Sequence, residues 1–355
     1  MRKRTDAILA SGAQSNFLPG AESPTGIETE SGRRSHMKLL VVILNYRTPM
    51  LVIDCLRSLG PQLQALGDCR VSLLDGNSPD DSVLQLRSAI DENGWGSWVD
   101  FRPLPVNGGF AYGNNRGIVS YLASHGAPAL VLLLNPDTVV RDGAVEALVR
   151  HMEEHRHVGI AGSRLEDPDG TPQRSAFRFP GIASEIAYGG GFGRFATHLR
   201  NCQLALPVTD EAVAVDWVAG ASMIVRREIF DSIGLLDERY FLYYEEVDFC
   251  LRAQRAGFRC EYVPASRVVH LVGRASGVTG PGDATRRRPA YWFESRRRFY
   301  TKNYGWMYRI ASDGAFAISL GLNRIRQAVL RTPATLPSHM WRDHVYHSAL
   351  RRRRA

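Results

Sequence analysis

The stretch KLLVVILNYRTPMLVIDCLRSL, residues 38–59, decides the fold that the sequence predicts, because an apolar run typical of a buried strand leads directly into a helix-like segment. The same alternation continues along the chain. Further apolar runs are RVSLL (70–74), VDFRPL (99–104) and ALVLLL (129–134), and the helical patterns between the runs cover about 50–66, 82–90 and 111–124. Such an alternation predicts a Rossmann-like α/β fold, with a mostly parallel central sheet and helices on both faces.

The two ends of the chain differ in composition from this region. Residues 1–36 are rich in Ser, Gly, Glu and Arg without periodicity, which predicts a disordered extension. The 355 residues carry a net charge of +8, yet residues 286–355 hold 16 basic and 3 acidic side chains, whereas residues 1–285 hold 28 and 33. We therefore expect three parts: an N-terminal extension (1–36), an α/β domain (37–285) and a basic, aromatic-rich helical C-terminal region (286–355).

The cysteines and the apolar stretches indicate where in the cell the protein is located. Five cysteines form no CxxC pair, and their odd number and wide spacing predict reduced thiols rather than a disulfide framework or a zinc site. No stretch approaches the roughly 18 apolar residues of a spanning helix. These features predict a cytoplasmic protein that is soluble or bound to a membrane surface.

Polar and glycine residues follow each predicted strand, where ligands of parallel α/β sheets bind. These candidate binding residues are Asn45, Arg47, Asp75, Asn77, Asn107, Gly109, Asn114, Asn135 and Asp137. Neither GxGxxG nor GxxxxGK[ST] occurs, so a nucleotide would bind without the usual phosphate loops. The segment NGGFAYGNNRG (107–117) comes nearest to a glycine-rich loop, and its simpler interpretation is a strand-to-helix turn.

Two residues are candidate metal ligands. Asp137 directly follows a predicted strand, where a carboxylate can hold a hard divalent cation. His270 closes the strand-like RVVH and is placed to complete that site or to contact a diphosphate. The simpler alternatives are an Asx turn at Asn135 and a structural histidine.

The segment FLYYEEVDFCLRAQRAGF, residues 241–258, reads as a helix that starts at Glu245. The helix dipole alone favours glutamates in the first turn. Glu246, however, shares a stripe with Phe249 and Cys250, so its carboxylate should point toward packed side chains at a cleft edge, as general-base catalysis on a hydroxyl requires.

Two residues upstream are candidates for acceptor binding. In DWVAGA (216–221), Trp217 is either a core residue or a platform on which a sugar face stacks. Gly220 lies just before the strand-like SMIVRR.

Together these segments resemble the inverting family 2 glycosyltransferases with the GT-A fold, and within them the bacterial rhamnosyltransferase-like branch. The resemblance runs from Lys38 to about Tyr304 and depends on six segments in order: VVILNYRTPMLVIDCLRSL, LLDGNSPDD, PVNGGFAYGNNRG, LLLNPDTVV, DWVAGASMIVRREIFDSIGLLDERYFLYYEEVDFCLRAQRAGF and VVHLVGRASG. It implies that a sugar is transferred from a dTDP- or UDP-sugar to a hydroxyl of a glycan or lipid-linked glycan in cell-surface polysaccharide biosynthesis. Rhamnose is the sugar that the resemblance favours.

The resemblance also implies residue roles. The positions Asn45, Arg47, Asp75 and Asn77 match the site for the nucleotide, and Asn107, Gly109 and Asn114 match the loop that closes over the donor. Asp137 matches the metal-binding DxD element, with Asn135 in place of its first Asp, and implies Mg²⁺ or Mn²⁺, which His270 can help to hold. Glu246 stands where the family usually has the catalytic Asp of an E-D pair, and Glu245 is placed to share its work.

The C-terminal region leaves other functions open. Aromatic residues alternate with arginines in RRRPAYWFESRRRFYTKNYGWMYRI (286–310), which suits an anionic membrane, single-stranded nucleic acid or an ordinary packed helix face. We favour peripheral contact with the inner face of the plasma membrane and expect no nucleic acid. The alternatives to a transferase are a nucleic-acid-binding protein that acts through this region and a catalytically silent nucleotide-sugar-binding module.

Overall fold

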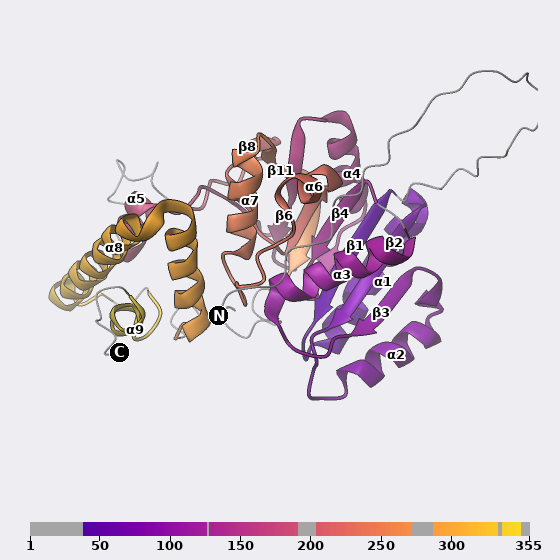
Figure 1. Cartoon of the computed structure of the whole chain (residues 1–355), viewed down its shortest axis with the longest axis horizontal. Helices are drawn as coiled ribbons and strands as arrows, with labels where there is room; N and C mark the ends of the chain where they lie inside the picture. The colour runs from indigo at the N-terminus through magenta and orange to yellow at the C-terminus, as the bar shows by residue number, and fades with distance from the viewer. Residues whose placement is uncertain (1–37, 126–127, 191–203, 272–286, 333–335, 349–355) are drawn as a thin grey trace, which may run out of the picture. The chain divides into compact units, whose positions relative to one another are not determined.

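A computed structural model of the chain describes residues 38–125, 128–190, 204–271, 287–332 and 336–348 (Figure 1). The predicted extension, residues 1–36, lies outside this range, as does Cys202. The elements up to residue 154 are β1 (Leu39–Asn45), α1 (Pro49–Leu66), β2 (Cys69–Asp75), α2 (Ser82–Glu92), η1 (Trp95–Ser97), β3 (Val99–Pro103), α3 (Gly109–His125), β4 (Leu130–Leu134), β5 (Thr138–Val140) and α4 (Ala144–Glu154). The later elements are β6 (Val158–Glu166), β7 (Ala176–Phe177), α5 (Ile182–Gly190), β8 (Val213–Val215), β9 (Trp217–Val218), β10 (Ser222–Arg226), α6 (Arg227–Ile233), α7 (Glu245–Arg255), β11 (Arg259–His270), α8 (Ala290–Leu330) and α9 (Met340–His347).

The first four strands form the parallel part of one large sheet. β1 lies between β2 and β4, and β3 continues the sheet beyond β2. The register places Asn45 opposite Asp75 and Asp75 opposite Pro103, so these strands end together at an edge that we term the carboxyl edge. β6 and β11 pair in parallel farther along the sheet. The predicted mostly parallel sheet is therefore confirmed.

Three strands run against the common direction. β10 lies between β4 and β6 and is antiparallel to both, while β5 and β8 are antiparallel to β11. Because β10 runs backward, its first residue, Ser222, pairs with Leu134 at the end of β4. The residues just before β10 therefore lie at the carboxyl edge.

Helices cover both faces of the sheet, as the sequence predicts (Figure 1). Leu39, Val41 and Ile43 pack on one face with side chains of α1, α2 and α4. Leu40 and Val42 pack on the other face with side chains of α3, α6 and α7. The alternation along a single strand thus builds two cores, and buried apolar area on both faces supplies most of the driving force for folding.

The C-terminal region is helical, as predicted, but much of it belongs to the core. α8 packs against α5 and α9, and it also contacts α7. Phe293, Phe299 and Tyr300 are buried. For these three rings the sequence left a membrane, a nucleic acid and a packed face open and favoured the membrane; the structure shows the packed alternative. Within the described residues, none of the helices combines the length and the apolar character that crossing a bilayer requires.

Candidate active site

The predicted nucleotide side of the site is a hydrogen-bond network at the ends of β1 and β2. Asn45 Nδ2 donates to Asp75 Oδ2 at 2.7 Å. Ser78 donates to the same carboxylate from its backbone nitrogen and its hydroxyl, both at 2.8 Å. Asn45 and Asp75 are fully buried. The structure therefore brings these two predicted residues together, and their contacts fix the loops that follow both strands.

Arg47 and Asn77 lie on those loops with left-handed backbones, at φ 60° and 59°. Arg47 N donates to Ser78 Oγ at 2.9 Å, which ties the first loop to the second. The left-handed conformation costs a residue with a Cβ roughly 1–2 kcal/mol, so the network must hold it in place. Both side chains are exposed, and both remain candidates for contact with a donor.

Residues 107–109 join the nucleotide side to the segment before α7. Gly109 adopts φ 84°, and a Cβ at this position would overlap the carbonyl oxygen of Phe241. Phe110 N donates to that oxygen at 2.8 Å, and Gly109 N donates to Asn107 Oδ1 at 3.1 Å. Because only glycine fits so close an approach, this segment is more than a strand-to-helix turn: it connects the two halves of the site.

Asn114 and its neighbour Asn115 both point into the protein. Asn114 Nδ2 donates to Phe110 O at 2.9 Å, and the side chain is buried within α3. Asn115, which the sequence analysis missed, donates to Leu236 O at 2.8 Å and accepts from Leu236 N at 3.2 Å. An asparagine that bonds both ways to a distant backbone fixes that segment, and the only sequence signal was a second Asn in the same helical turn.

The two candidate metal ligands meet at another point of the carboxyl edge. β5 pairs with the end of β11, with Thr138 opposite His270. Asp137 Oδ1 lies 3.5 Å from His270 Nε2, and the Asp137 side chain is buried. Asn135, half-buried, donates from its backbone nitrogen to Ala221 O at 2.9 Å. No group of three or more His, Cys, Asp or Glu side chains arranged to hold a metal occurs among the described residues.

Gly220 lies where the separate segments of the site converge. A Cβ on Gly220 would lie 3.6 Å from Glu246 Cβ and 3.6 Å from Phe110 Cζ. The next residue, Ala221, accepts the hydrogen bond from Asn135. The start of α3, the loop after β4 and the start of α7 therefore meet at two consecutive small residues.

Glu245 and Glu246 begin α7, and each leaves one carboxylate oxygen without a hydrogen-bond partner among the described residues. Glu245 is buried and Glu246 is half-buried, and the oxygen concerned is Oε2 in each. Burial raises the pKa of Glu246 to about 7. Burial and then the charge of Glu246 raise the pKa of Glu245 well above its ordinary value. A carboxylate with a pKa near 7 is suited to accept a proton at neutral pH.

The loop before α7 is strained and is held by α8. Tyr243 and Tyr244 are consecutive residues with φ 69° and 70°. Tyr291 stacks on Tyr243 with 6.2 Å between ring centroids, and Ser295 Oγ donates to Leu242 O at 3.0 Å. Strain of this kind persists only where surrounding contacts impose it. The sequence analysis missed this role of the C-terminal region.

Trp217 takes the core alternative, which corrects its assignment as an acceptor platform. Its side chain is 8% exposed. The ring stacks on Phe177 at 4.1 Å between centroids, and Nε1 donates to Arg178 O at 2.8 Å. Because the covered ring leaves no open face for a sugar, only Gly220 of the two predicted acceptor residues remains a candidate.

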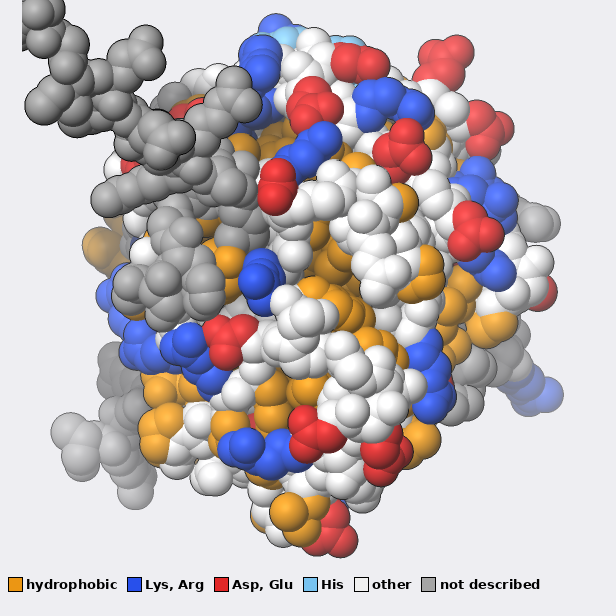
Figure 2. Space-filling view, turned by 90° about the vertical axis from the view of Figure 1, so that its right-hand side faces the viewer, with side chains coloured by type: hydrophobic (Ala, Val, Ile, Leu, Met, Phe, Trp, Pro, Cys, Tyr) orange, Lys and Arg blue, Asp and Glu red, His pale blue; other side chains and the backbone are white. Residues whose placement is uncertain are grey.

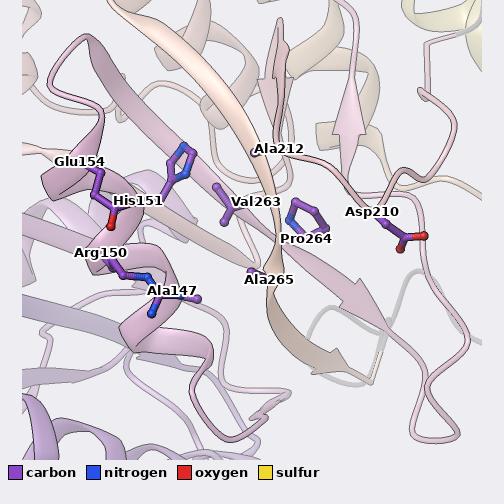
Figure 3. Close-up of a pocket in the computed structure, with 9 residues that line it drawn as sticks. All are labelled: Ala147, Arg150, His151, Glu154, Asp210, Ala212, Val263, Pro264 and Ala265. Atoms are coloured by element: carbon purple, nitrogen blue, oxygen red, sulfur yellow. The ribbon is translucent and has the colours of Figure 1, made fainter.

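A pocket of about 300 Å³ lies away from these residues, between α4 and β11 (Figure 3). Its lining includes Arg150 and His151 of α4 and Val263 and Pro264 of β11. None of the predicted site residues lines it. This pocket is therefore distinct from the candidate active site.

Comparison with known families agrees with this arrangement. Residues 130–337 match the family described as "Glycosyl transferase family group 2", and residues 40–211 match the one described as "Glycosyl transferase family 2". Between them the two matches cover all the predicted site residues.

Curated relatives give the same picture. N-acetylglucosaminyl-diphospho-decaprenol L-rhamnosyltransferase of Mycobacterium tuberculosis is 30% identical over 191 residues, which are 51% of this chain and 62% of that protein. Rhamnosyltransferase WbbL of Escherichia coli is 26% identical over 207 residues, 57% of this chain and 69% of that protein. The chain thus spans less than two thirds of the length of the mycobacterial relative and slightly more than two thirds of WbbL.

A solved structure shows the same fold at low identity. The structure described as GalNAc-T7 with UDP, GalNAc and Mn²⁺ aligns with a TM-score of 0.55 and 16% identity, over 88% of this chain and 55% of that one. This likeness agrees with the GT-A fold predicted from the sequence.

Proposed function

The chain belongs to glycosyltransferase family 2, and on this premise we propose that it transfers a sugar from a nucleotide diphosphate sugar to a hydroxyl of a glycan or lipid-linked glycan. The proposed sugar is rhamnose, carried by dTDP or UDP, and the proposed setting is cell-surface polysaccharide biosynthesis. The names of the two relatives support rhamnose as the sugar, and one of them names a lipid-linked acceptor. One observation carries the proposal: a buried Asn45–Asp75 network, the Asp137–His270 pair and Glu246 with its raised pKa lie at the same edge of the sheet.

The donor would lie along the carboxyl edge. The exposed side chains of Arg47 and Asn77 stand on fixed turns and are the proposed nucleotide contacts. Asn45 and Asp75 hold those turns through Ser78 and leave the base and ribose a pre-shaped surface. Such preorganisation lowers the entropy that binding costs.

Asp137 and His270 fit part of a divalent cation site. A carboxylate and an imidazole with facing atoms 3.5 Å apart are both suitable ligands. We propose that they hold Mg²⁺ or Mn²⁺, with the remaining ligands from water and the donor diphosphate. When bound, the cation would offset the negative charge of the departing nucleotide diphosphate. Because Asn135 is neutral, Asp137 supplies the carboxylate of this site.

Glu246 is the proposed catalytic base. Its half-buried carboxylate would accept the proton of the acceptor hydroxyl. The hydroxyl oxygen then attacks the anomeric carbon from the face opposite the nucleotide, the bond to the diphosphate breaks, and the anomeric configuration inverts. Glu245 is more deeply buried, and its raised pKa favours the neutral form, so we assign it a supporting role.

We place the reaction in the cytoplasm, at the inner face of the plasma membrane, where a lipid-linked acceptor would be presented. Nucleic-acid bases stack on exposed rings, whereas Phe293, Phe299 and Tyr300 are buried. Trp306 of the same region is 64% exposed, but the three covered rings remove much of the stacking surface that a nucleic acid needs, so we expect no nucleic-acid partner.

Ligand-induced stabilisation tests the proposal directly. We expect one member of a panel of dTDP- and UDP-sugars to raise the melting temperature, with a gain near 2.7 kcal/mol at 100 times its Kd. Asp137→Ala should abolish the part of this gain that depends on Mg²⁺ or Mn²⁺. The transfer product, examined by NMR, should have the anomeric configuration opposite to that of the donor.

Two outcomes would contradict the proposal. No stabilisation by any nucleotide sugar, with or without metal, would exclude the donor site. Stabilisation without transfer to any acceptor would favour the catalytically silent binding module instead.

A further inference from the structure

The second half of α8 places polar side chains on its buried face and apolar side chains on its exposed face, the reverse of an ordinary surface helix. The helix bends at Gly305, whose φ of 86° interrupts it, and continues to Leu330. The buried face of this half carries polar side chains as well as Phe316 and Leu320, and those polar side chains are Ser312, Asp313, Ser319 and Asn323. Asp313 and Ser312 accept hydrogen bonds from Arg296, itself buried, at 2.6 and 2.9 Å. A helix that hides polar groups this way leaves apolar ones to face outward.

The outward face is an apolar stripe. Its exposed large side chains are Met307, Ile310, Ile318, Leu322, Ile325 and Val329. Their spacing of three, four or eight residues places them on one side of the helix. Ile318 is 65% exposed and Val329 is 73% exposed, although such side chains are normally buried. A contiguous exposed stripe of this kind marks a binding surface.

The charges around the stripe have one sign. From Gly305 to Leu330 the sole acidic residue is Asp313, which is buried. Arg324 and Arg326 lie beside the stripe, and Arg331 follows its end. The face of the molecule at the right of Figure 1 is different, because there acidic and basic side chains are interspersed (Figure 2). The α8 stripe therefore combines apolar and purely cationic chemistry.

α9 adds an aromatic side chain at the edge of this surface. Trp341 is 39% exposed, and its Nε1 donates to Ala317 O at 3.1 Å. A Cβ on Gly321 would lie 3.6 Å from the same nitrogen. Tryptophan is enriched at the boundary between apolar and polar layers, where its ring is partly wet.

We propose that the outer face of α8 from Met307 to Leu330, with Trp341 at its edge, docks on an anionic lipid bilayer. The apolar stripe would enter the headgroup layer with the helix parallel to the membrane, and the arginines would contact lipid phosphates. A second copy of the chain fits less well, because a symmetric contact would bring arginines together without exposed acidic partners on this stretch. The sequence placed the membrane contact at residues 286–310, and the proposed surface instead begins at Met307 and runs to the end of the helix. This docking does not depend on the proposed function, which supplies only its biological purpose.

Vesicle co-sedimentation of the full chain tests this surface. We expect the protein to bind vesicles of phosphatidylglycerol and phosphatidylcholine at least tenfold more tightly than vesicles of phosphatidylcholine alone. The double variant Ile318→Glu/Ile325→Glu should lose at least tenfold in binding to the anionic vesicles. The matched control is Leu84→Glu, because Leu84 is 67% exposed on α2, away from the stripe, and should bind as the wild type does.

The outcomes separate docking from catalysis and from self-association. Melting temperature and stabilisation by nucleotide sugars, measured on the same variants, should be unchanged, since the substituted side chains are exposed and lie outside the candidate active site. Equal binding of wild type and double variant to anionic vesicles would overturn the proposal, as would no binding by the wild type. A wild-type dimer in light scattering that the double variant dissociates, without vesicle binding, would assign the stripe to a second copy instead.

Discussion

The carboxylates on the two sides of the candidate active site differ in how completely they are hydrogen-bonded. Asp75 is fully buried and accepts hydrogen bonds from Asn45 and from both the backbone and the hydroxyl of Ser78. Glu245 and Glu246 each keep an oxygen without a hydrogen-bond partner among the described residues, and burial raises the pKa of both. In the proposed mechanism the fully hydrogen-bonded Asp75 shapes the donor surface, whereas the carboxylates at the start of α7 exchange a proton with the acceptor.

The backbone segments that carry these carboxylates also differ in what holds them in place. The loops after β1 and β2 are fixed by contacts between residues close to them, such as Arg47 N to Ser78 Oγ. The strained Tyr243–Tyr244 turn is instead fixed from outside, by Gly109 of α3 and by Tyr291 and Ser295 of α8. The geometry of the proposed nucleotide side is thus set at the sheet edge itself, whereas the geometry of the proposed base depends on two distant segments, α3 and α8.

The sharpest test of the comparison is Glu246→Gln. If Glu246 is the base, removal of its acidic oxygen should lower kcat by about 10²–10⁴-fold, the usual contribution of general-base catalysis. Donor binding, measured by thermal shift, should stay within about twofold, because the nucleotide side does not depend on this carboxylate. Initial rates with saturating donor and acceptor measure the loss.

Two companion variants make that result interpretable. Glu245→Gln should lower kcat less than Glu246→Gln, since the Glu245 pKa already favours the neutral form. Glu246→Asp should recover part of the lost rate, because it restores the carboxylate one methylene short. A larger loss in Glu245→Gln than in Glu246→Gln would reverse the two assignments.

Gly109→Ala should break the link between the two sides. The added Cβ must displace the Phe241 carbonyl and also adopt φ 84°, so we expect a loss of about 3 kcal/mol or more in the free energy of unfolding. Because Phe241 precedes the α7 loop, kcat should fall more than donor affinity. Urea unfolding and steady-state kinetics measure the two effects.

Gly143→Ala is the matched control for Gly109→Ala. Gly143 has φ 74°, yet a Cβ there would meet nothing within 4 Å, so its cost should be the conformational term alone, roughly 1–2 kcal/mol. Equal destabilisation in the two variants would show that the contact with Phe241 contributes nothing.

Strand direction marks the limit of what the sequence predicts about the fold. β1 through β4 were predictable because each apolar run is tied to the next by a helix, which imposes parallel pairing. The run that became β10 reads equally well in either direction, and only its antiparallel pairing with β4 brings Gly220 to the carboxyl edge. Strand direction is set by tertiary pairing, which local patterning does not contain.

The candidate site divides in the same way. Asn45, Asp75 and Asp137 could be found because each lies at the end of a strand or within three residues of it. The approach of His270 to Asp137 depends on β5, a strand of three residues with no pattern of its own. The left-handed turn before α7 consists of tyrosines, whereas glycines would have indicated such a turn in the sequence. For Trp217 the sequence left a core residue and a sugar platform open, and only its contact with Phe177 decides between them.

The smallest expected effect concerns stability against pH. The folded pKa of Glu246 is raised from 4.5 to about 7, so between these values the folded state keeps a proton that the unfolded state has lost. The free energy of unfolding should therefore fall as pH rises from about 4.5 to 7, by at most about 3 kcal/mol from this group. Glu246→Gln should flatten that slope and be more stable than the wild type at pH 8, whereas Glu92→Gln, at an exposed position on α2, should track the wild type. Parallel curves for wild type and Glu246→Gln in urea unfolding at pH 5 and 8 would mean that Glu246 is as well solvated as a surface carboxylate, and the contrast with Asp75 would then lie in hydrogen bonding alone.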